Sequence, residues 1–150
     1  ERFALLLERA LGSLGISRAV MVGHSLGSAY ANYAIQHDQR AGRCLFVGSV
    51  LIDPIACLLH HCTTTKEFVY TRITSPKDYV EDYIFKKELW TSKIIARELP
   101  WHQASFWLED AHLQRPTLIA VGERDRIVSA SRIRAAFGSW KARLRGVRVL

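Results

Sequence analysis

The spacing of apolar residues alternates along the chain between a helical period and short continuous runs. From residue 1 to residue 14, apolar side chains recur at positions i, i+3, i+4 and i+7, which predicts an amphipathic helix that ends near Gly12 and Gly15. Short apolar runs predict four strands, at residues 18–23, 43–52, 117–121 and 147–150. The run at 43–52 is nearly continuous, so we expect both faces of that strand to be covered.

Two further helices are expected between these strands. One covers about residues 25–36, and the other follows the strand at 117–121 and begins at a cap provided by Ser129 or Ser131. This alternation is typical of an α/β protein with a parallel sheet and right-handed crossovers. We expect the sheet to continue beyond the end of the chain.

A long segment, residues 54–115, separates the second and third predicted strands. It is too long for an ordinary crossover and is expected to be mostly helix and loop. Nine of the fifteen aromatic residues lie between Phe68 and Trp107. The segment is therefore predicted to be a helical cap that forms an apolar roof over an active site. It divides the chain into a core unit at 1–53, the cap at 54–115 and a second core unit at 116–150.

The composition fits one compact domain or part of a larger one, with 150 residues of which 49% are hydrophobic. No apolar run is long enough to span a bilayer, and the N-terminus has no signal-peptide pattern. The three cysteines form an odd set, which argues against a disulfide framework and favours a reducing, intracellular compartment. No cofactor is indicated.

A formal net charge of +7 would suit a nucleic acid or an anionic membrane as partner. Much of this charge interleaves with Ile133, Phe137 and Trp140 at helical spacing, which is typical of a solvated helix face. No nucleic-acid-binding motif accompanies it, so no such partner is predicted; attraction to a membrane surface stays open without support. The charged positions are Arg124, Arg126, Arg132, Arg134, Lys141, Arg143, Arg145 and Arg148.

The segment Gly23-His24-Ser25-Leu26-Gly27 joins the first predicted strand to a helix. A G-x-S-x-G at such a corner is the nucleophile elbow, which presents a serine hydroxyl at the tip of a tight, strained turn. Side chains at positions 23 and 27 would collide where helix and strand pack closely, so glycine is expected at both. Ser25 is therefore predicted to be a catalytic nucleophile.

Two aspartates follow strand ends and are candidates for the acid that orients a catalytic base. Asp125 lies in the loop after the strand at 117–121, at the same sheet edge as the elbow, and fits the order Ser…Asp…His. A turn-forming or helix-capping role is the alternative for Asp125. Asp53 is the rival acid, although Asp53-Pro54 is also typical of a turn that ends a strand. Asp125 is favoured.

The catalytic histidine is not identified in this sequence. It should follow the last strand, whereas all six histidines precede Asp125. His24 is expected to point away from Ser25, and His37, at a helix end, is expected to be solvated. Residues 60–62 cannot all face one ion, so no metal site is predicted. The six histidines are His24, His37, His60, His61, His102 and His112.

The oxyanion hole is also predicted to be half complete. One donor is the backbone N–H of Leu26, the residue after the nucleophile, and the second would come from a loop before residue 1. Nucleophile, acid and cap are thus present, whereas the base and one oxyanion donor are missing. We therefore expect this chain to be a fragment of a longer polypeptide.

These motifs resemble those of the α/β-hydrolase fold superfamily. Residues 23–27 match its elbow, and Gly122-Glu123-Arg124-Asp125-Arg126-Ile127-Val128 matches its G-x-x-D-x-[IV]-V acid segment. The resemblance covers essentially the whole chain and implies the C-terminal half of the sheet, strands five to eight, with a cap inserted. A narrower similarity, to an uncharacterised fungal group of α/β-hydrolases, rests on residues 53–55, 58–60, 68–70 and 107–110.

The resemblance implies a serine hydrolase of the esterase or lipase type, since the dehalogenases of this fold have aspartate at the elbow. The apolar cap favours a carboxylic ester with a hydrophobic part as the small-molecule substrate. Ser25 would form an acyl-enzyme, and Asp125 would orient a histidine beyond Leu150. Two alternatives stay open, a non-catalytic ligand-binding relative and an inactive truncated product. No oligomeric state is predicted.

Overall fold

The computed structural model describes residues 2–70, 72–107, 115–139 and 146–150. The sheet and the helices beside it are α1 (Arg2–Ser13), β1 (Ala19–His24), α2 (Gly27–Arg40), β2 (Phe46–Ile52), β3 (Thr117–Ala120), α7 (Ala130–Phe137) and β4 (Val147–Val149). Between β2 and β3 lie short helical elements: η1 (Ile55–Cys57), α3 (Cys62–Val69), α4 (Pro76–Glu81), η2 (Asp82–Lys86), α5 (Leu89–Lys93), η3 (Ile94–Glu98) and α6 (Trp101–Ala104). Of the two predicted caps for α7, Ser129 is the one that accepts a backbone N–H, from Arg132.

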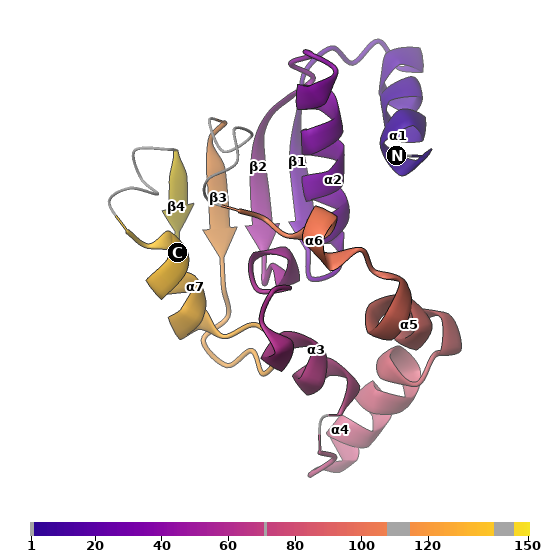
Figure 1. The fold of residues 1–150 in the computed structure, drawn as a ribbon, viewed down its shortest axis with the longest axis vertical. Coiled ribbons are helices and arrows are strands. Elements are labelled where there is room, and N and C mark those ends of the chain that lie inside the picture. The colour runs from indigo at the N-terminus through magenta and orange to yellow at the C-terminus, as the bar shows by residue number, and fades with distance from the viewer. Residues whose placement is uncertain (1, 71, 108–114, 140–145) are drawn as a thin grey trace.

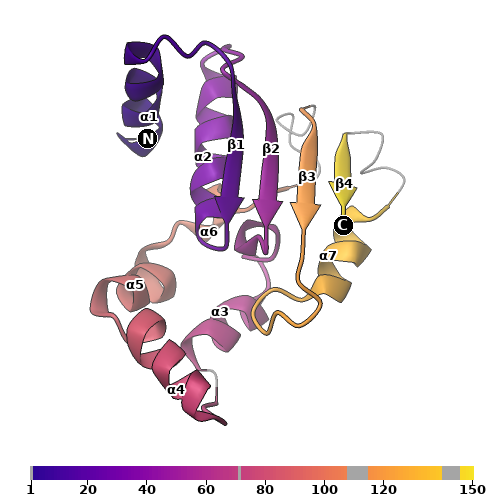
Figure 2. The ribbon, with the colours of Figure 1, turned by 180° about the vertical axis from the view of Figure 1, so that it is seen from behind.

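The four strands form one parallel sheet in the order β1-β2-β3-β4. Val22 pairs with Val50, and Val50 pairs with Leu118, so alternate residues of neighbouring strands share a face. Helices α2 and α7 lie against one face of the sheet, as Figures 1 and 2 show from its two sides. The predicted α/β class with a parallel sheet is confirmed.

The main hydrophobic core lies between that face and the helices. Leu51 of β2 and Ile119 of β3 are almost fully buried and belong to one cluster with Ile133 of α7. Leu58, just after η1, and Phe106, just after α6, belong to the same cluster. Both ends of the segment between β2 and β3 are therefore anchored in the core.

The opposite face of the sheet is covered by none of the described helices (Figure 2). Val20 and Val22 of β1 are 56% and 62% exposed, and Val50 and Leu118 are half-buried. The prediction that the strand at 43–52 is covered on both faces is therefore wrong for this face, because the described helices that touch the sheet pack on the other side.

The apolar stripe of α1 is only partly buried, although the predicted helix is confirmed. Leu7 and Leu11 pack against a small cluster that includes Ile35 of α2. Leu6 and Leu14 remain exposed to solvent. The helix is therefore held to the rest of the molecule along one side of its stripe.

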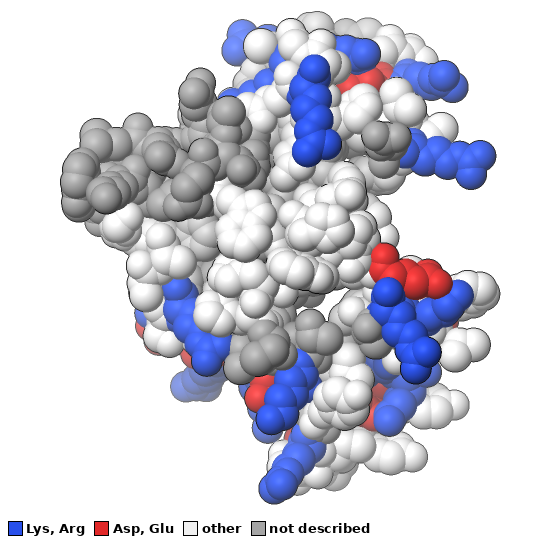
Figure 3. All heavy atoms as spheres, in the orientation of Figure 1, with Lys and Arg blue, Asp and Glu red and all other residues white. Residues whose placement is uncertain are grey.

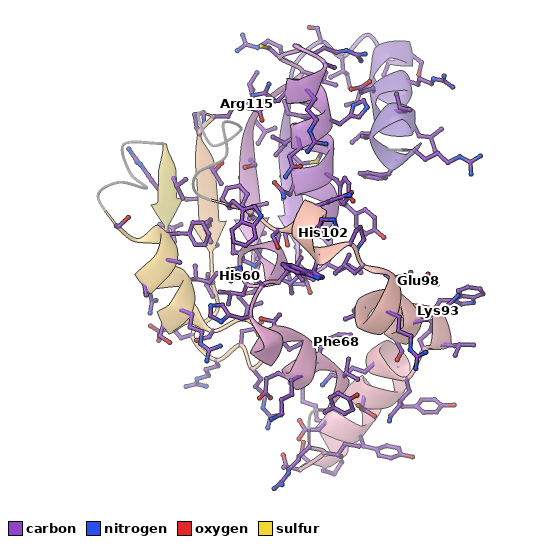
Figure 4. The ribbon with its side chains drawn as sticks, viewed as in Figure 1. His60, Phe68, Lys93, Glu98, His102 and Arg115 are labelled. Atoms are coloured by element: carbon purple, nitrogen blue, oxygen red, sulfur yellow. The ribbon has the colours of Figure 1, made fainter. Side chains whose placement is uncertain are left out.

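A buried ion pair fixes the end of the sheet opposite the elbow, where Figure 4 places Arg115. Asp38, at the end of α2, is fully buried, and its Oδ2 lies 2.6 Å from Nη1 of Arg115. The same carboxylate accepts the backbone N–H groups of Leu45 and Phe46. Arg115 also donates to the carbonyl oxygens of Arg43 and Phe46. One carboxylate thus joins α2 to the beginnings of β2 and β3.

The predicted solvated face of the last helix is present where the structure describes it. Arg132 and Arg134 of α7 are exposed, whereas Ile133 and Phe137 are buried. Positions 140–145 lie outside the described residues. Across the described ranges, every helix is too short or too polar to cross a bilayer.

Candidate active site

Ser25 occupies the corner between β1 and α2 in a conformation that non-glycine residues rarely adopt. Its φ is +49°, in the left-handed region. Its N–H donates to the carbonyl oxygen of Ile52 at 3.0 Å. Its own carbonyl oxygen accepts the N–H of Ser28 at 3.0 Å and the Ser28 hydroxyl at 2.6 Å. The neighbouring strand and helix therefore hold the strained turn in place.

The two glycines of the elbow differ in what surrounds them. A Cβ at Gly23 would lie 2.7 Å from the carbonyl oxygen of Gly27 and 2.9 Å from Cα of Ser28, so the predicted close packing is confirmed there. A Cβ at Gly27 would meet nothing within 4 Å. The steric prediction for Gly27 is therefore wrong, because it is the backbone of Gly27 that makes the close approach.

Ser25 lines a cavity of about 440 Å³ between the sheet edge and the segment that follows β2. Most of the side chains around it are apolar, and they come from both parts of the chain. The elbow, the residues just after β2 and the loop after β3 contribute His24, Ser25, Leu26, Ile55, Leu59 and Ile127. The segment from α3 to η3 contributes Thr64, Phe68, Ile84, Lys86, Glu88, Thr91 and Ile95.

The apolar side chains of this lining are mainly aliphatic, although the prediction of an apolar roof started from the aromatic residues of the segment. Among the described aromatic side chains, Phe68 lines the cavity. Tyr79, Tyr83 and Trp90 are instead between 61% and 71% exposed. Much of the aromatic clustering in the sequence therefore comes from side chains on the outer surface of these helices, which the sequence pattern alone does not distinguish from an inner surface.

Leu26 places a backbone donor beside the nucleophile. Leu26 is the residue directly before the 14-residue helix α2, and its own φ is −58°. It also lines the cavity. Within the described residues, its N–H donates to no acceptor. An amide at the positive end of a helix is well suited to stabilise a developing oxyanion.

Asp125 lies in the loop after β3 and caps the backbone that follows it. Its Oδ1 accepts the N–H groups of Ile127 and Val128, each at 2.7 Å. Its Oδ2 has no hydrogen-bond partner among the described residues. The turn-forming role that the sequence left open is therefore real, and it leaves the second oxygen available to orient a base.

Asp53, the rival acid, follows β2 and contacts the ends of β1 and β3. Its φ is +43°, and its Oδ1 accepts the N–H of Gly122 at 2.7 Å. Its own N–H donates to the carbonyl oxygen of Ala120 at 2.8 Å, and its Oδ2 lies 3.9 Å from Nε2 of His24. Asp53 thus positions the start of the loop that carries Asp125.

The described histidines do not complete a triad. His24 is 69% exposed and faces Asp53. His37 is not solvated as expected, because its Nδ1 lies 3.1 Å from a carboxylate oxygen of Glu8 in a partly buried pair. Burial and the neighbouring His61 lower the pKa of His60. His102 is exposed on α6 (Figure 4), and His112 lies outside the described residues.

The described residues contain no group of three or more His, Cys, Asp or Glu side chains that could hold a metal ion. His60 and His61 stack with their ring centres 4.5 Å apart, and His60 also lies 5.0 Å from the ring of Trp107. The rings of these histidines therefore pack against each other and, for His60, against Trp107.

No protein-family model and no curated protein sequence matches the chain. Solved structures do match it. Carboxyl esterase 2 from the mycorrhizal fungus Tuber melanosporum is 22% identical over 98% of this chain, with a TM-score of 0.53. A membrane phospholipase A, described as a bacterial virulence factor, is 18% identical over 97% with a TM-score of 0.52. Monoacylglycerol lipase from Paleococcus ferrophilus is 17% identical over 98% with a TM-score of 0.51.

The chain has the α/β-hydrolase fold. It spans 47% of the esterase, 53% of the phospholipase and 62% of the lipase, and it corresponds to the C-terminal half of the fold, as predicted. At these identities the likeness establishes the fold and leaves the substrate open. The narrower similarity to a fungal group of hydrolases stays a prediction.

Two contacts that position residues of this hydrolase-fold site were not predicted from the sequence. The buried Ser28 hydroxyl accepts the N–H of Ala56 at 3.1 Å and so joins the elbow to η1. On α4, Asp78 lies 2.8 Å from Arg126, the residue after Asp125. The contact of Ser28 could have been anticipated from a small polar residue directly after the elbow. The contact between Asp78 and Arg126 could not, because it joins residues far apart in sequence and has no local motif.

Proposed function

We propose that this chain carries the nucleophile and the acid of a serine hydrolase that cleaves a carboxylic ester with a hydrophobic part. The observation that carries the proposal is Ser25, held in a left-handed turn against an apolar cavity. Three structures of similar fold are named as an esterase, a lipase and a phospholipase, which agrees with a small-molecule ester as substrate.

In this mechanism Oγ of Ser25 attacks the ester carbonyl while a base takes its proton. The amide of Leu26 stabilises the oxyanion of the tetrahedral intermediate. The base then protonates the leaving alcohol, which gives an acyl-enzyme that water hydrolyses. Asp125 holds the base in position through Oδ2, because Oδ1 is fixed by two backbone N–H groups.

The base and the second oxyanion donor belong, in this proposal, to polypeptide outside the 150 residues. Two observations support this view. Of the described histidines, His24 alone lines the Ser25 cavity, and its Nε2 faces Asp53. The chain also spans about half to three-fifths of the length of the similar structures. The fragment interpretation therefore remains part of the proposal.

The segment at 54–115 acts in this proposal as a cap that receives the apolar part of the ester. Phe68, Ile84 and Ile95 from this segment face the same cavity as Ser25. A cavity of about 440 Å³ suits a small ligand with a hydrocarbon portion. In this proposal the chain is divided into a core unit at 1–53, the cap at 54–115 and a second core unit at 116–150.

The experiment that tests the proposal measures hydrolysis of p-nitrophenyl octanoate by the intact protein. Ser25→Ala is expected to lower kcat about 10⁴-fold or more, since it removes the nucleophile. Ser13→Ala is the matched control, because that hydroxyl is exposed on α1, where it donates to the carbonyl oxygen of Ala10. Equal activity of the two variants would contradict the assignment of Ser25.

The two candidate acids are separated by a pair of isosteric variants. Asp125→Asn keeps the Oδ1 acceptor for Ile127 and Val128 but loses the charge that holds the base, so kcat should fall about 10³- to 10⁴-fold. Asp53→Asn keeps the acceptor for Gly122 and should lower kcat far less. The reverse order would identify Asp53 as the acid.

The two other functions that the sequence left open make different predictions for the same protein. A ligand-binding relative would bind octanol in the cavity and hydrolyse nothing. An inactive truncated product would neither bind nor hydrolyse. Turnover that depends on Ser25 excludes both.

A further inference from the structure

A second pocket, of about 310 Å³, adjoins the Ser25 cavity and is lined by charged side chains. One wall is the loop from Arg124 to Ile127, which carries Asp125, and the other is the cap segment between Arg72 and Lys86. Lys86 and Ile127 line both pockets. A ligand whose one end lies beside Ser25 can therefore place its other end in the charged pocket.

Cationic side chains outnumber carboxylates around this pocket, with five Lys or Arg against three Asp among the described residues. Arg126 and Asp78 neutralise each other, because Nη1 lies 2.8 Å from Oδ1. The second oxygen of Asp78 accepts the N–H and the hydroxyl of Thr74. Asp82, a further carboxylate of the lining, lies 3.9 Å from Nζ of Lys87. These pairs leave the pocket positive.

Three of the lining cations, Arg72, Lys86 and Arg124, form no ion pair with any described side chain. Nζ of Lys86 lies 6.0 Å from the ring centre of Phe68, a residue of the Ser25 cavity. Figure 3 shows several Lys and Arg side chains at the lower end of the molecule, with some Asp and Glu among them, as well as others at the upper end. Like charges gathered at one pocket repel one another, and a bound anion removes that repulsion.

We propose that this pocket binds a compact oxyanion, phosphate being the clearest example, that is part of the ester substrate. The apolar chain of such a substrate occupies the Ser25 cavity, and its anionic group contacts Arg72, Lys86 and Arg124. This inference rests on the proposed function and names its substrate class, an ester with a hydrophobic chain and an anionic group on opposite sides of the scissile bond.

The test measures binding by calorimetry in the intact protein with Ser25→Ala, so that no turnover intervenes. Octyl phosphate is expected to bind at least about tenfold more tightly than octanol, because charge-assisted hydrogen bonds add to the same apolar contact. Arg72→Gln and Arg124→Gln should each lower the affinity for octyl phosphate about tenfold and leave octanol unchanged. Arg124→Lys should retain most of the affinity, which separates loss of charge from loss of fold.

The matched control is Lys93→Gln, a cap variant that should change neither affinity. Lys93 lies on the outer side of the cap in an ion pair with Glu98 at 2.8 Å and lines neither pocket (Figure 4). Inorganic phosphate alone should bind weakly and compete poorly, since it lacks the apolar chain.

Equal affinity for octyl phosphate and octanol, or arginine variants that behave like Lys93→Gln, would overturn the proposal. Inorganic phosphate that binds as tightly as octyl phosphate would also overturn it, because the site would then serve a free anion. Binding is measured without the Ser25 hydroxyl, so failure of the hydrolase proposal would appear in the turnover assay and leave this result intact.

Discussion

At the scale of single residues, the elbow requires glycine at position 23 but not, for steric reasons, at position 27. The carbonyl of Gly27 and Cα of Ser28 lie against Gly23, whereas the Cβ position of Gly27 is open. The motif G-x-S-x-G does not distinguish the two glycines, because a sequence shows that a glycine is present but not whether other atoms lie close to it. The structure separates the two.

Gly23→Ala is expected to destabilise the protein and Gly27→Ala is not. A Cβ at position 23 would lie 2.7 Å from a backbone oxygen, so strand and helix must separate, at a cost of about 1–3 kcal/mol in free energy of unfolding. At position 27, in the first turn of α2, alanine should be neutral or stabilise by up to about 1 kcal/mol. Urea unfolding of both variants measures the difference. Equal losses of stability would contradict the geometry of the elbow.

The buried carboxylate of Asp38 is the residue on which the far end of the sheet depends. Asp38→Ala leaves the largely buried Arg115 without its ionic partner and removes the acceptor of two backbone N–H groups. The free energy of unfolding should fall by about 3–5 kcal/mol, measured by urea titration.

Glu123→Ala is the control for this substitution. Glu123 pairs with Arg134 at 3.3 Å, but both side chains are at least half exposed, so the loss should stay below about 1 kcal/mol. Similar losses for Asp38→Ala and Glu123→Ala would contradict the structural role assigned to Asp38.

The positions of Ser25 at a strand-to-helix corner and of Asp125 in the loop after β3 could be predicted from the sequence, because each lies in a short motif with its own local geometry. The contact between Asp53 and Gly122 could not, since it joins residues 69 positions apart. Its effect is visible only once β2 and β3 are neighbours in the sheet.

At the scale of elements, the sequence predicted the strands and the helix-and-loop character of the segment between β2 and β3, but not the bounds of the short helices in that segment. The runs that form β1, β2, β3 and β4 are apolar and bounded by turn residues, which is sufficient for a strand. The segment between β2 and β3 consists of short helices interrupted by the π-helical turns η2 and η3, and its exposed side chains include Tyr79, Tyr83 and Trp90. Such elements depend on tertiary contacts more than on periodicity.

The ion pair between Asp78 of α4 and Arg126, in the loop after β3, is expected to make the stability of this part of the molecule depend on pH. The hydroxyl and the N–H of Thr74 hold the pKa of Asp78 well below its usual range, and Arg126 adds to this effect. A carboxyl whose pKa is lowered by folding stabilises the folded state above its ordinary pKa of about 4, and this stabilisation is lost as the pH falls below that value. The bridge should therefore hold at neutral pH and weaken in acid.

Asp78→Asn tests this expectation through the melting temperature between pH 7 and pH 3. The wild-type protein should melt at a higher temperature than the variant above about pH 4, and the difference should shrink below it. Thr74→Val removes the hydroxyl that donates to Asp78 and should reduce the same pH dependence. A difference that stays constant over the whole range would contradict the role of Asp78.

At the scale of the whole molecule, the sheet presents one covered face and one open face. β1 is an edge strand that pairs with β2, and its Val20 and Val22 point away from the helices. An edge strand with exposed apolar side chains is a site of association. The sequence predicted the strands, but which face the helices cover depends on how the segments pack.

The 150-residue chain expressed by itself is therefore expected to self-associate. Sedimentation velocity should show species larger than a monomer, and the double variant Val20→Lys, Val22→Lys should reduce them. Ile73→Lys is the control, because Ile73 is 47% exposed on the cap and not on the sheet. A chain that stays monomeric, or a control that reduces association equally, would contradict this role of the open face.

The central claim, that Ser25 is the nucleophile, is tested most directly by finding the acyl group. The intact protein is mixed with p-nitrophenyl octanoate, quenched in acid during the first turnover, digested and examined by mass spectrometry. The account predicts an octanoyl ester on the peptide that contains Ser25, and on Ser25 within it. Release of p-nitrophenol with Ser25 unmodified, or with the octanoyl group on another residue, would contradict it.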